Sequence, residues 1–366
     1  MRVGIIGTGF GCSVQVPGFQ ACPGVEVAAL CSRTEERARE YGGRLGIPSV
    51  YTDFHAMLEM AELDLISIVT PPDLHYPMTL AAMSAGKHVL CEKPMALDSR
   101  EALEMYRQAE AKGIIHQINH QQRFDPNRTE IKRIIESGEI GSIYHATINI
   151  TTPHRADPVA VPWSWWSQAK RGGGSLGATA SHQLDLLRWW FGELDAVSCQ
   201  VRTFVGRRSD GKGQSMKAVD SEDQCSIAAD FSGGQLGLIN ITSVARTNLG
   251  IRIEVHGQTG SVVLDGRERL WLYRGASDEA EDITQHNPNT ALPRIPATLS
   301  ARAFVSLARH LTRAIGRNKM PELGATFLDG YRCQVALDAA RASALERRWV
   351  RLADAEQPTG AGAQRA

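Results

Sequence analysis

The first 120 residues of the chain alternate between two hydrophobic patterns. Short, continuous apolar runs predict buried strands, and the segments between them carry apolar residues at helical spacing. The predicted strands are Val3–Ile6, Val25–Cys31, Asp64–Thr70, His88–Cys91 and Ile114–Ile118, and the predicted helices are Glu35–Tyr41, a segment through Met78–Ser84, and Ser99–Ala111. Strands that alternate with helices predict a doubly wound parallel sheet with helices on both faces, the Rossmann arrangement.

After Arg123 the pattern changes to long strand candidates separated by short turns. A helix is predicted at Ile131–Ser137, and helical periodicity returns only near the end, at Ala301–Ile315 and Phe327–Glu346. The predicted strands are Ile143–Thr151, Ala196–Val205, Cys225–Phe231, Gln235–Val244, Ile251–His256 and Ser261–Leu264. This order predicts an α+β domain with a large, mainly antiparallel open sheet and helices on one face.

The length of 366 residues exceeds what one ordinary core accommodates, so two domains are expected. We predict a Rossmann domain at 1–121 and a substrate-binding and oligomerisation domain at 122–354. The segment 355–366 is rich in glycine and alanine and predicts a disordered tail.

The charge balance gives no reason to expect a nucleic-acid or membrane partner. Lys plus Arg and Asp plus Glu both number 40, and no apolar run approaches the roughly 18 residues that span a bilayer. The seven cysteines include no Cys-x-x-Cys pair, which argues against a disulfide framework or a metal site. Because Met1-Arg2 leads directly into the first strand, no signal peptide is expected. Together these features predict a cytoplasmic protein.

A glycine-rich turn, Gly7-Thr8-Gly9-Phe10-Gly11, connects the first strand to the first helix. Gly7 permits a tight turn, and Gly9 lets the backbone approach a pyrophosphate. The third small residue of the fingerprint falls at Cys12. A turn without a ligand is the alternative, but the strand–turn–helix context favours a dinucleotide site.

The end of the second strand sets the coenzyme preference. An acid there would bind the ribose hydroxyls of NAD, but this chain has Cys31-Ser32-Arg33-Thr34. Ser32 can hydrogen-bond a 2′-phosphate and Arg33 can pair with it, so NADP is favoured and NAD stays possible. The alternative is an ordinary solvated arginine.

The fourth strand ends in Glu92-Lys93-Pro94, which places an acid and an amine at the carboxyl edge of the sheet. Ligands bind at that edge in open α/β folds. Pro94 cannot extend the strand ladder. Taken alone, the tripeptide is also compatible with a surface turn.

Several motifs in this order resemble one family, the Gfo/Idh/MocA oxidoreductases (glucose–fructose oxidoreductase, inositol dehydrogenase and rhizopine catabolism). The matching segments are Gly7–Gly11, Thr70-Pro71-Pro72-Asp73-Leu74-His75, Gly86–Pro94, Asn119-His120 with Arg123-Phe124, Gly172–Gly174, Ser181-His182-Gln183-Leu184-Asp185 and Asp329-Gly330-Tyr331-Arg332.

The resemblance implies that Lys93 lies beside the nicotinamide ribose and the substrate. It also implies that Thr70, Pro71 and His75 line the cofactor, with Glu92 near the nicotinamide. For His75, a packing or capping role is the alternative. The family's open sheet usually supports oligomers, so we expect a homo-oligomer, a dimer or tetramer formed through the C-terminal sheet.

The motif around His182 predicts the second half of the site. His182 and Asp185 share one face of a helix predicted from Ser181 to Phe191. An imidazole suits proton exchange at neutral pH, although a histidine satisfied by the helix backbone is the alternative. Asp185 is a catalytic candidate or orients the helix. Many family members carry an aspartate four residues before this histidine, and Ala178 stands there.

Three tryptophans in four residues, Trp163-Ser164-Trp165-Trp166, follow His154-Arg155. Their rings can stack on a sugar or on an aromatic ligand, or they can pack at a subunit interface. We take Arg155, Trp163 and Trp166 as substrate candidates. Asn119 and His120, at the end of the fifth strand, are two more.

The leading prediction is therefore an NAD(P)-dependent oxidoreductase that acts on a sugar, a cyclic polyol or a related hydroxyl or keto compound. Lys93 would stabilise the reacting oxygen and His182 would relay the proton, with no metal involved. One alternative is a lyase or glycosidase that uses NAD for transient oxidation. The other is a non-catalytic dinucleotide-binding protein, suggested by Ala178.

Overall fold

The computed structural model describes residues 1–60, 62–213, 215–277 and 279–356. They form two compact units. The first unit comprises Met1–Ile131, Lys170–Gly172 and Gln285–Tyr331, and the second holds Lys132–Ala169, Gly173–Thr284 and the described residues from Arg332 on. The predicted boundary at residue 121 divides the chain once. The compact units divide it differently, because residues 285–331 belong to the first unit. Most of the predicted tail, 357–366, lies outside the described residues.

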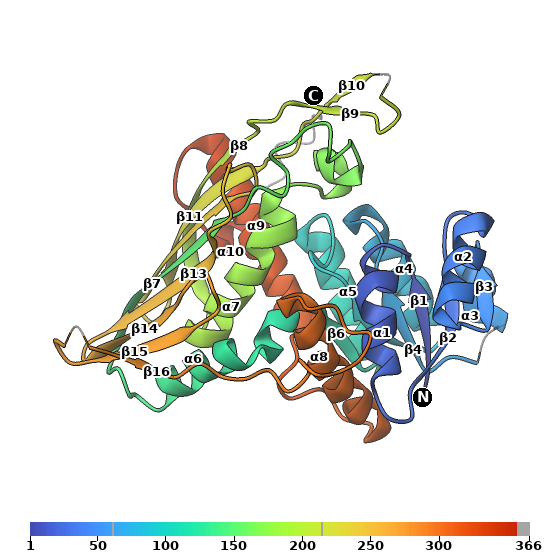
Figure 1. Ribbon diagram of the computed structural model, residues 1–366, viewed down its shortest axis with the longest axis horizontal. Helices are drawn as coiled ribbons and strands as arrows, with labels where there is room; N and C mark the ends of the chain where they lie inside the picture. The colour runs from blue at the N-terminus through green and yellow to red at the C-terminus, as the bar shows by residue number, and fades with distance from the viewer. Residues whose placement is uncertain (61, 214, 278, 357–366) are drawn as a thin grey trace. The chain divides into compact units, whose positions relative to one another are not determined.

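The first unit contains a six-stranded sheet in which all pairings are parallel. The strand order is β3-β2-β1-β4-β5-β6, and the sheet lies at the right of Figure 1. The strands are β1 (Arg2–Ile6), β2 (Glu26–Cys31), β3 (Ser49–Tyr51), β4 (Leu65–Ile68), β5 (His88–Cys91) and β6 (His116–Ile118). The predicted Rossmann arrangement is confirmed. Among the strands of this sheet, β3 was not predicted, because its three half-buried residues form no apolar run.

Both faces of this sheet are buried, which explains why its strands are apolar throughout. Alternate residues point to two different clusters: Ile5 and Leu65 pack with α1 and α8, while Ile6 and Ile66 pack with α3, α4 and α5. The covering helices are α1 (Val16–Gln20), α2 (Glu35–Leu45), α3 (Phe54–Met60), α4 (His75–Ser84), α5 (Ser99–Ala111) and α8 (Leu299–Gly316).

Helix α8 comes from the last quarter of the chain, yet it covers the N-terminal sheet. The rings of Phe304 and Phe19 meet edge to face with centroids 5.3 Å apart. A Cβ on Gly18 would lie 2.5 Å from the Phe304 ring, so the glycine permits this close approach. The sequence predicts the helix itself but not the sheet that it covers.

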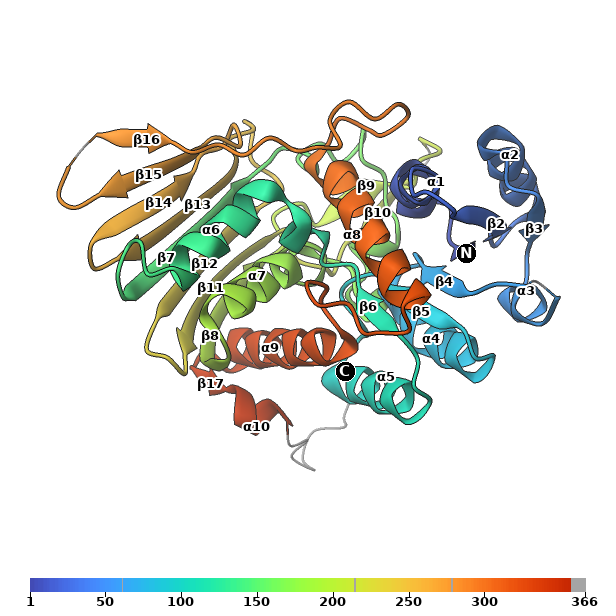
Figure 2. The ribbon, with the colours of Figure 1, turned by 90° about the horizontal axis from the view of Figure 1, so that it is seen from below.

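The second unit is built on a nine-stranded sheet, ordered β16-β15-β14-β13-β7-β12-β11-β8-β17 and drawn in Figure 2. All its pairings are antiparallel except β7 with β12. The strands are β7 (Ile143–Thr151), β8 (Leu194–Arg202), β11 (Gln224–Phe231), β12 (Leu236–Thr242), β13 (Gly250–Gly257), β14 (Gly260–Leu264), β15 (Leu270–Arg274), β16 (Ala280–Asp282) and β17 (Val350–Arg351). The predicted mainly antiparallel sheet is confirmed, and β15, β16 and β17 are additional strands.

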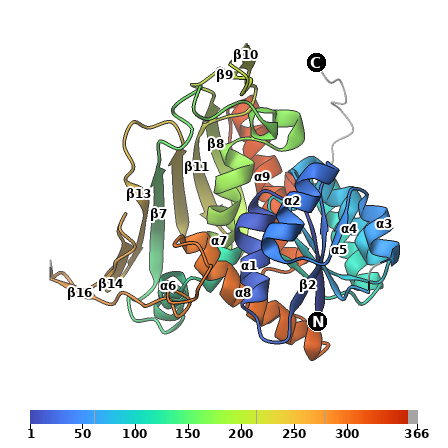
Figure 3. The same ribbon diagram turned by 45° about the vertical axis from the view of Figure 1, so that its right-hand side comes forward.

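Helices cover one face of this sheet. In Figure 3, α7 (Ser181–Phe191) and α9 (Phe327–Glu346) lie on the same side of its strands. Ser343 of α9 accepts a hydrogen bond from the amide of Cys199 in β8, at 2.9 Å. Along β7 every second residue is buried, as expected for a sheet covered on one side. The half-exposed residues of β7, among them Thr147 and Asn149, therefore lie on the other face of the sheet.

Outside the nine-stranded sheet, strands β9 (Arg207–Ser209) and β10 (Met216–Ala218) form a separate two-stranded arm. Helix α6 spans Pro126–Glu136 and so begins five residues before the predicted start at Ile131, because proline is favoured in the first turn of a helix. All seven cysteines lie among the described residues, where they are buried and form no disulfide bond. Among the described helices, none is long and apolar enough to cross a membrane.

Candidate active site

The glycine-rich turn leaves its backbone open to a ligand. Gly7 has φ +117°, and a Cβ there would lie 2.3 Å from the carbonyl oxygen of Val69, so the fold itself requires this glycine. Gly9 differs, because no heavy atom lies within 4 Å of the position that its Cβ would occupy. Packing does not explain Gly9, whereas close approach of a pyrophosphate does. The turn therefore fits a dinucleotide.

The end of β2 carries Ser32 and Arg33, the two residues predicted to select the coenzyme. Ser32 is buried and its amide donates to the carbonyl of Tyr51, while Arg33 is exposed. One turn into α2, the guanidinium groups of Arg37 and Arg44 lie over the Tyr41 ring. The first turn of α2 also carries Glu35 and Glu36, so arginines and acids lie side by side here, and the preference for NADP stays a prediction.

His75 connects two segments at the edge of the sheet. Its ring nitrogens lie 2.9 Å from the carbonyl oxygen of Pro94 and 2.8 Å from that of Thr70. Burial lowers the pKa of His75, mainly through desolvation of the cation. These contacts give His75 a role in packing, and lining of the cofactor by Thr70, Pro71 and His75 stays a prediction.

Glu92 follows β5 as a buried acid that amide donors surround. Its Oε1 accepts a hydrogen bond from Nε2 of Gln15 at 2.8 Å and another from Nδ2 of Asn119. Oε1 of Gln15 in turn accepts from Ser67 in β4. Burial raises the pKa of Glu92, and Lys93, Asn119 and Gln15 oppose that rise.

Sequence reasoning missed Gln15 and Ser67. Both lie between apolar residues, in Val14-Gln15-Val16 and Ile66-Ser67-Ile68, and both are fully buried. A polar residue inside an apolar run is the signal that could have found them, because buried polar groups need hydrogen-bond partners.

Lys93 comes next, at the carboxyl end of β5, and the peptide bond to Pro94 is cis. Burial lowers the pKa of Lys93, and the negative charge of Glu92 raises it. The acid thus helps to keep a partly buried ammonium protonated. A cation held in this way can stabilise negative charge on a substrate oxygen.

In the second unit, a glycine pair leads to His182. A Cβ on Gly173 would lie 2.2 Å from the carbonyl oxygen of Trp166, and one on Gly174 would lie 2.3 Å from the Glu222 carboxylate. Glu222 accepts a hydrogen bond from the amide of Leu176 at 2.7 Å. This packing fixes a π-helical turn, Leu176–Ala180, immediately before α7.

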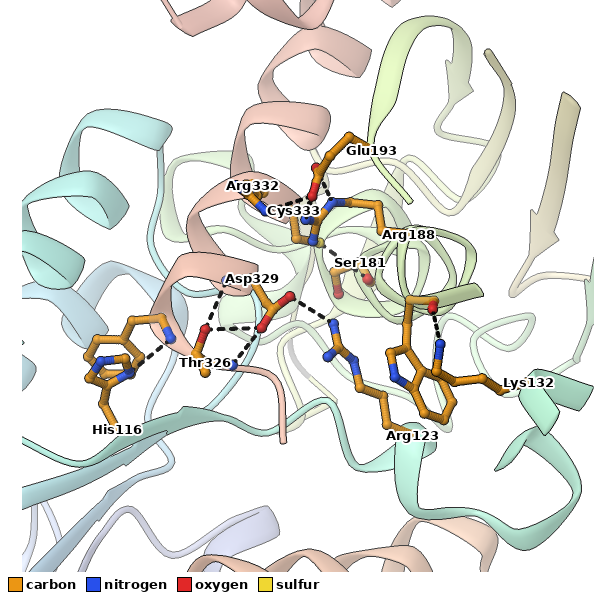
Figure 4. Close-up of polar contacts among 12 residues, drawn as sticks. His116, Arg123, Lys132, Ser181, Arg188, Glu193, Thr326, Asp329, Arg332 and Cys333 are labelled. Atoms are coloured by element: carbon orange, nitrogen blue, oxygen red, sulfur yellow. Dashed lines mark hydrogen bonds and ion pairs between the residues drawn. The ribbon is translucent and has the colours of Figure 1, made fainter. Parts of the chain in front are cut away.

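His182 occupies the first turn of α7 and Asp185 lies one turn further on, and both are buried. Contacts around the helix hold it in place. Glu193 accepts from Arg188 at 2.9 Å and from Arg332 at 2.7 Å, while the Cys333 thiol donates to the carbonyl of Ser181 (Figure 4). These contacts hold the helix that carries His182.

Two other family-type residues have structural contacts in the first unit. Arg123 pairs with Asp329 at 3.2 Å, and Asp329 also accepts from the amide of Thr326, just before α9 (Figure 4). The hydroxyl of Thr326 accepts from the amide of Asp329 in return, so the two residues form a capping box at the start of the helix.

Two tryptophans of this segment, Trp163 and Trp166, make different contacts. Trp163 donates its indole N–H to the carbonyl of Ala218 and lies under Lys217, so it anchors the β9–β10 arm. Trp166 instead stacks with the guanidinium of Arg155, which is 3.7 Å from the ring centroid. Asn119 donates a hydrogen bond from its Nδ2 to Glu92. The next residue, His120, is buried. Contact of these residues with substrate stays a prediction.

The fold and these residues define a class of protein, an oxidoreductase with an NAD-binding Rossmann domain. A model of the GFO_IDH_MocA oxidoreductase family, NAD-binding Rossmann fold, matches residues 1–120, and the C-terminal alpha/beta domain of the same family matches residues 132–352. The chain belongs to the Gfo/Idh/MocA oxidoreductase family, as the motifs predict.

Similar proteins cover almost the whole chain. An uncharacterized oxidoreductase of Synechocystis is 28% identical over 366 residues, which cover 98% of this chain and 97% of the relative. Levoglucosan dehydrogenase of Pseudarthrobacter phenanthrenivorans is 29% identical over 96% of this chain and 97% of its own. A solved structure of levoglucosan dehydrogenase with NADH and L-sorbose has a TM-score of 0.87 at 28% identity, covering 98% of this chain and 100% of that one.

Proposed function

We propose that the protein transfers a hydride between a nicotinamide coenzyme and a hydroxyl or keto carbon of a sugar, a cyclic polyol or a related compound. The observation that carries this proposal is the Glu92–Lys93 pair at the carboxyl end of β5, in a domain whose glycine turn fits a dinucleotide. Relatives named as levoglucosan and myo-inositol dehydrogenases support a carbohydrate-like substrate. The coenzyme would accept or supply the hydride.

Lys93 would stabilise negative charge on the reacting oxygen. Its ammonium is partly buried, where an electrostatic interaction is stronger than in water, and Glu92 keeps it protonated. The removal of one such donor typically costs a factor of about 10² to 10³ in rate.

His182 would exchange the proton of the same oxygen as a general acid and base. Its place in the first turn of a well-held helix supports this role. Asp185, one turn further on, would orient the helix or assist the imidazole. Ala178 leaves the turn before His182 without the acid that many relatives carry, so His182 would act without that carboxylate.

The test uses Lys93→Met with Lys112→Met, at an exposed site, as the matched control. Reduction of NAD and NADP would be followed at 340 nm against sugars, inositols, sugar acids and keto-sugars. We expect Lys93→Met to lose turnover by about 10² or more while it binds NADH normally. Unchanged turnover in Lys93→Met would exclude the role of Lys93.

For the coenzyme, we propose a preference for NADP over NAD, based on Ser32 and Arg33 at the end of β2. Solved relatives in complex with NADH support NAD as the other possibility. Arg33→Ala should raise KM for NADPH more than for NADH. A wild-type enzyme that strongly prefers NADH would overturn the preference for NADP.

We also propose that the open face of the nine-stranded sheet forms a homo-oligomer interface. Leu236 and Leu238 of β12 are 52% and 48% exposed on this face. Light scattering should give a multiple of the protomer mass, and Leu238→Lys should lower it. A wild-type monomer would exclude this interface.

A further inference from the structure

Two buried arginines lie together in the second unit, and only one of them has a clear structural task. Arg208 is 1% exposed, and its guanidinium donates to the carbonyl oxygens of Arg155, Asp157 and Val161. It thereby holds the loop that contains Arg155. These three carbonyl contacts satisfy its two terminal nitrogens, while its Nε has no acceptor in the described part of the chain.

Arg155 is 6% exposed, and its guanidinium lies on the Trp166 ring. Within the described part of the chain, its Nε and Nη2 are buried without a hydrogen-bond acceptor. Stacking on the ring offsets part of the charge but leaves the N–H donors unsatisfied. A buried donor without a partner costs about 1–3 kcal/mol, and more when it is charged.

The two unsatisfied nitrogens lie on the same edge of the guanidinium. That edge forms two parallel hydrogen bonds with the oxygens of a carboxylate or a phosphate. A planar fork that is already fixed by stacking loses little entropy when it binds such a group. Arg155 therefore has the donor pair of an oxyanion site, and because both nitrogens are closed to solvent in this structure, a ligand reaches them only when neighbouring side chains move.

Two charges of opposite sign act on Arg155, the cation of Arg208 and the carboxylate of Asp223. Asp223, whose charge acts on Arg155, already accepts from the amides of Phe204 and Val205 at 2.9 and 2.8 Å. Burial and Arg208 lower the pKa of Arg155 to about 10, so it stays cationic at neutral pH.

Arg155 is also connected to the turn that precedes His182. Its amide donates to the carbonyl of Ser243, and the Ser243 hydroxyl lies 3.5 Å from that of Ser175. The following turn, Leu176–Ala180, contains no ionisable side chain. The side chains of this turn, which includes Ala178, thus supply no carboxylate, and burial raises the pKa of Glu222, which accepts from the Leu176 amide.

We propose that Arg155 binds an oxyanion of the substrate, so the substrate is an acidic sugar rather than a neutral one. A carboxylate of a sugar acid is the expected group, and the phosphate of a sugar phosphate offers the same pair of oxygens. The inference rests on the proposed dehydrogenase function, because it assigns the substrate class of that reaction.

The first test compares matched sugars that differ only in the anionic group. The panel is D-glucose, D-glucuronate and D-glucose 6-phosphate, with the corresponding galactose set. We expect kcat/KM for one acidic member to exceed that for its neutral partner by about 100-fold, and Arg155→Met to remove this difference mainly through KM. Arg155→Lys keeps the charge but loses the fork, so it should recover at most a tenth of the wild-type kcat/KM. Arg246→Met, at an exposed site, is the control and should change no ratio.

The second test measures binding without turnover. Quenching of tryptophan fluorescence by the same compounds, with NADH present, should depend on Arg155, and circular dichroism should confirm that both Arg155 variants are folded. If Arg155→Met does not fold, Arg155→Lys carries the comparison.

The outcomes separate the inference from the proposed function. Binding of acids that depends on Arg155, without any nicotinamide oxidation or reduction, supports the oxyanion site and contradicts the dehydrogenase function. Turnover of neutral sugars with no preference for their acids supports the function and overturns the oxyanion site. Binding of neither uronates nor sugar phosphates also overturns it.

Discussion

Glu92 in the first unit and Arg155 in the second are both buried charges, but their surroundings differ. Glu92 accepts hydrogen bonds from Gln15 and Asn119 and lies beside the cationic Lys93. Arg155 rests on an aromatic ring, and two of its nitrogens have no acceptor in the described part of the chain. The first charge is satisfied by the protein itself, whereas the second is not.

This difference separates groups that build a site from groups that receive a ligand. Hydrogen bonds to a charged group stabilise the folded protein only when both partners are in place. The cluster around Glu92 therefore contributes to stability before any ligand binds. Arg155 costs stability in the free protein, and an oxyanion would offset that cost. Substitutions at Glu92, Gln15 and Arg155 test this contrast.

The largest effect is expected when the charge of Glu92 is removed together with its hydrogen-bonding capacity. Glu92→Leu leaves the amides of Gln15 and Asn119 without an acceptor and Lys93 without its acid. Unfolding in urea should show a loss of about 3 kcal/mol or more. The control Glu62→Leu, at a side chain that is 94% exposed, should change stability by less than about 1 kcal/mol.

Removal of a single bridging amide should have a smaller effect. Gln15→Leu leaves Glu92 and Ser67 without one partner each, and we expect a loss of about 1–3 kcal/mol in the free energy of unfolding. Gln20→Leu, which removes one exposed hydrogen bond to Leu45, is the matched control. Equal melting temperatures for Gln15→Leu and wild type would mean that the buried chain of hydrogen bonds contributes nothing.

Glu92→Gln should keep the shape of the cluster and change its pH dependence. Activity should fall as pH rises through the pKa of Lys93, which burial places below the ordinary lysine value. Because Glu92 raises that pKa, its loss should move the alkaline limb of kcat/KM to lower pH. A limb in the same place in both proteins would show that the acid does not control the protonation of Lys93.

The smallest change in stability is expected at Arg155. Arg155→Met replaces a buried, partly unsatisfied cation with an apolar chain, so the ligand-free protein should lose less than about 1 kcal/mol or become more stable. A loss comparable to that of Gln15→Leu would mean that Arg155 is a structural residue, like Arg208.

The sequence predicts elements best where one period runs without interruption. Helices Ser99–Ala111, Ser181–Phe191 and Phe327–Glu346 and strand Ile143–Thr151 begin and end at the predicted residues. In the first of these helices, the Asp98 side chain accepts from the amide of Glu101 and fixes the start.

Long-range partners were not predictable. Gln15 and Glu92 are 77 residues apart, and nothing local in either segment specifies the pairing. The tryptophan-rich segment drew attention to Arg155, but the absence of an acceptor for its fork depends on packing from several strands and loops. The packing of α8 against Phe19 is likewise a contact between segments that are far apart in the sequence, so neither segment predicts it.

The most direct test of the central claim follows the hydrogen itself. The fastest substrate of the panel, deuterated at its carbons, would be incubated with oxidised coenzyme, and the deuterium in the reduced nicotinamide would be measured by mass spectrometry. Hydride transfer predicts one deuterium in the nicotinamide for each product molecule. Product formation without net reduced coenzyme would contradict the account and indicate transient oxidation instead.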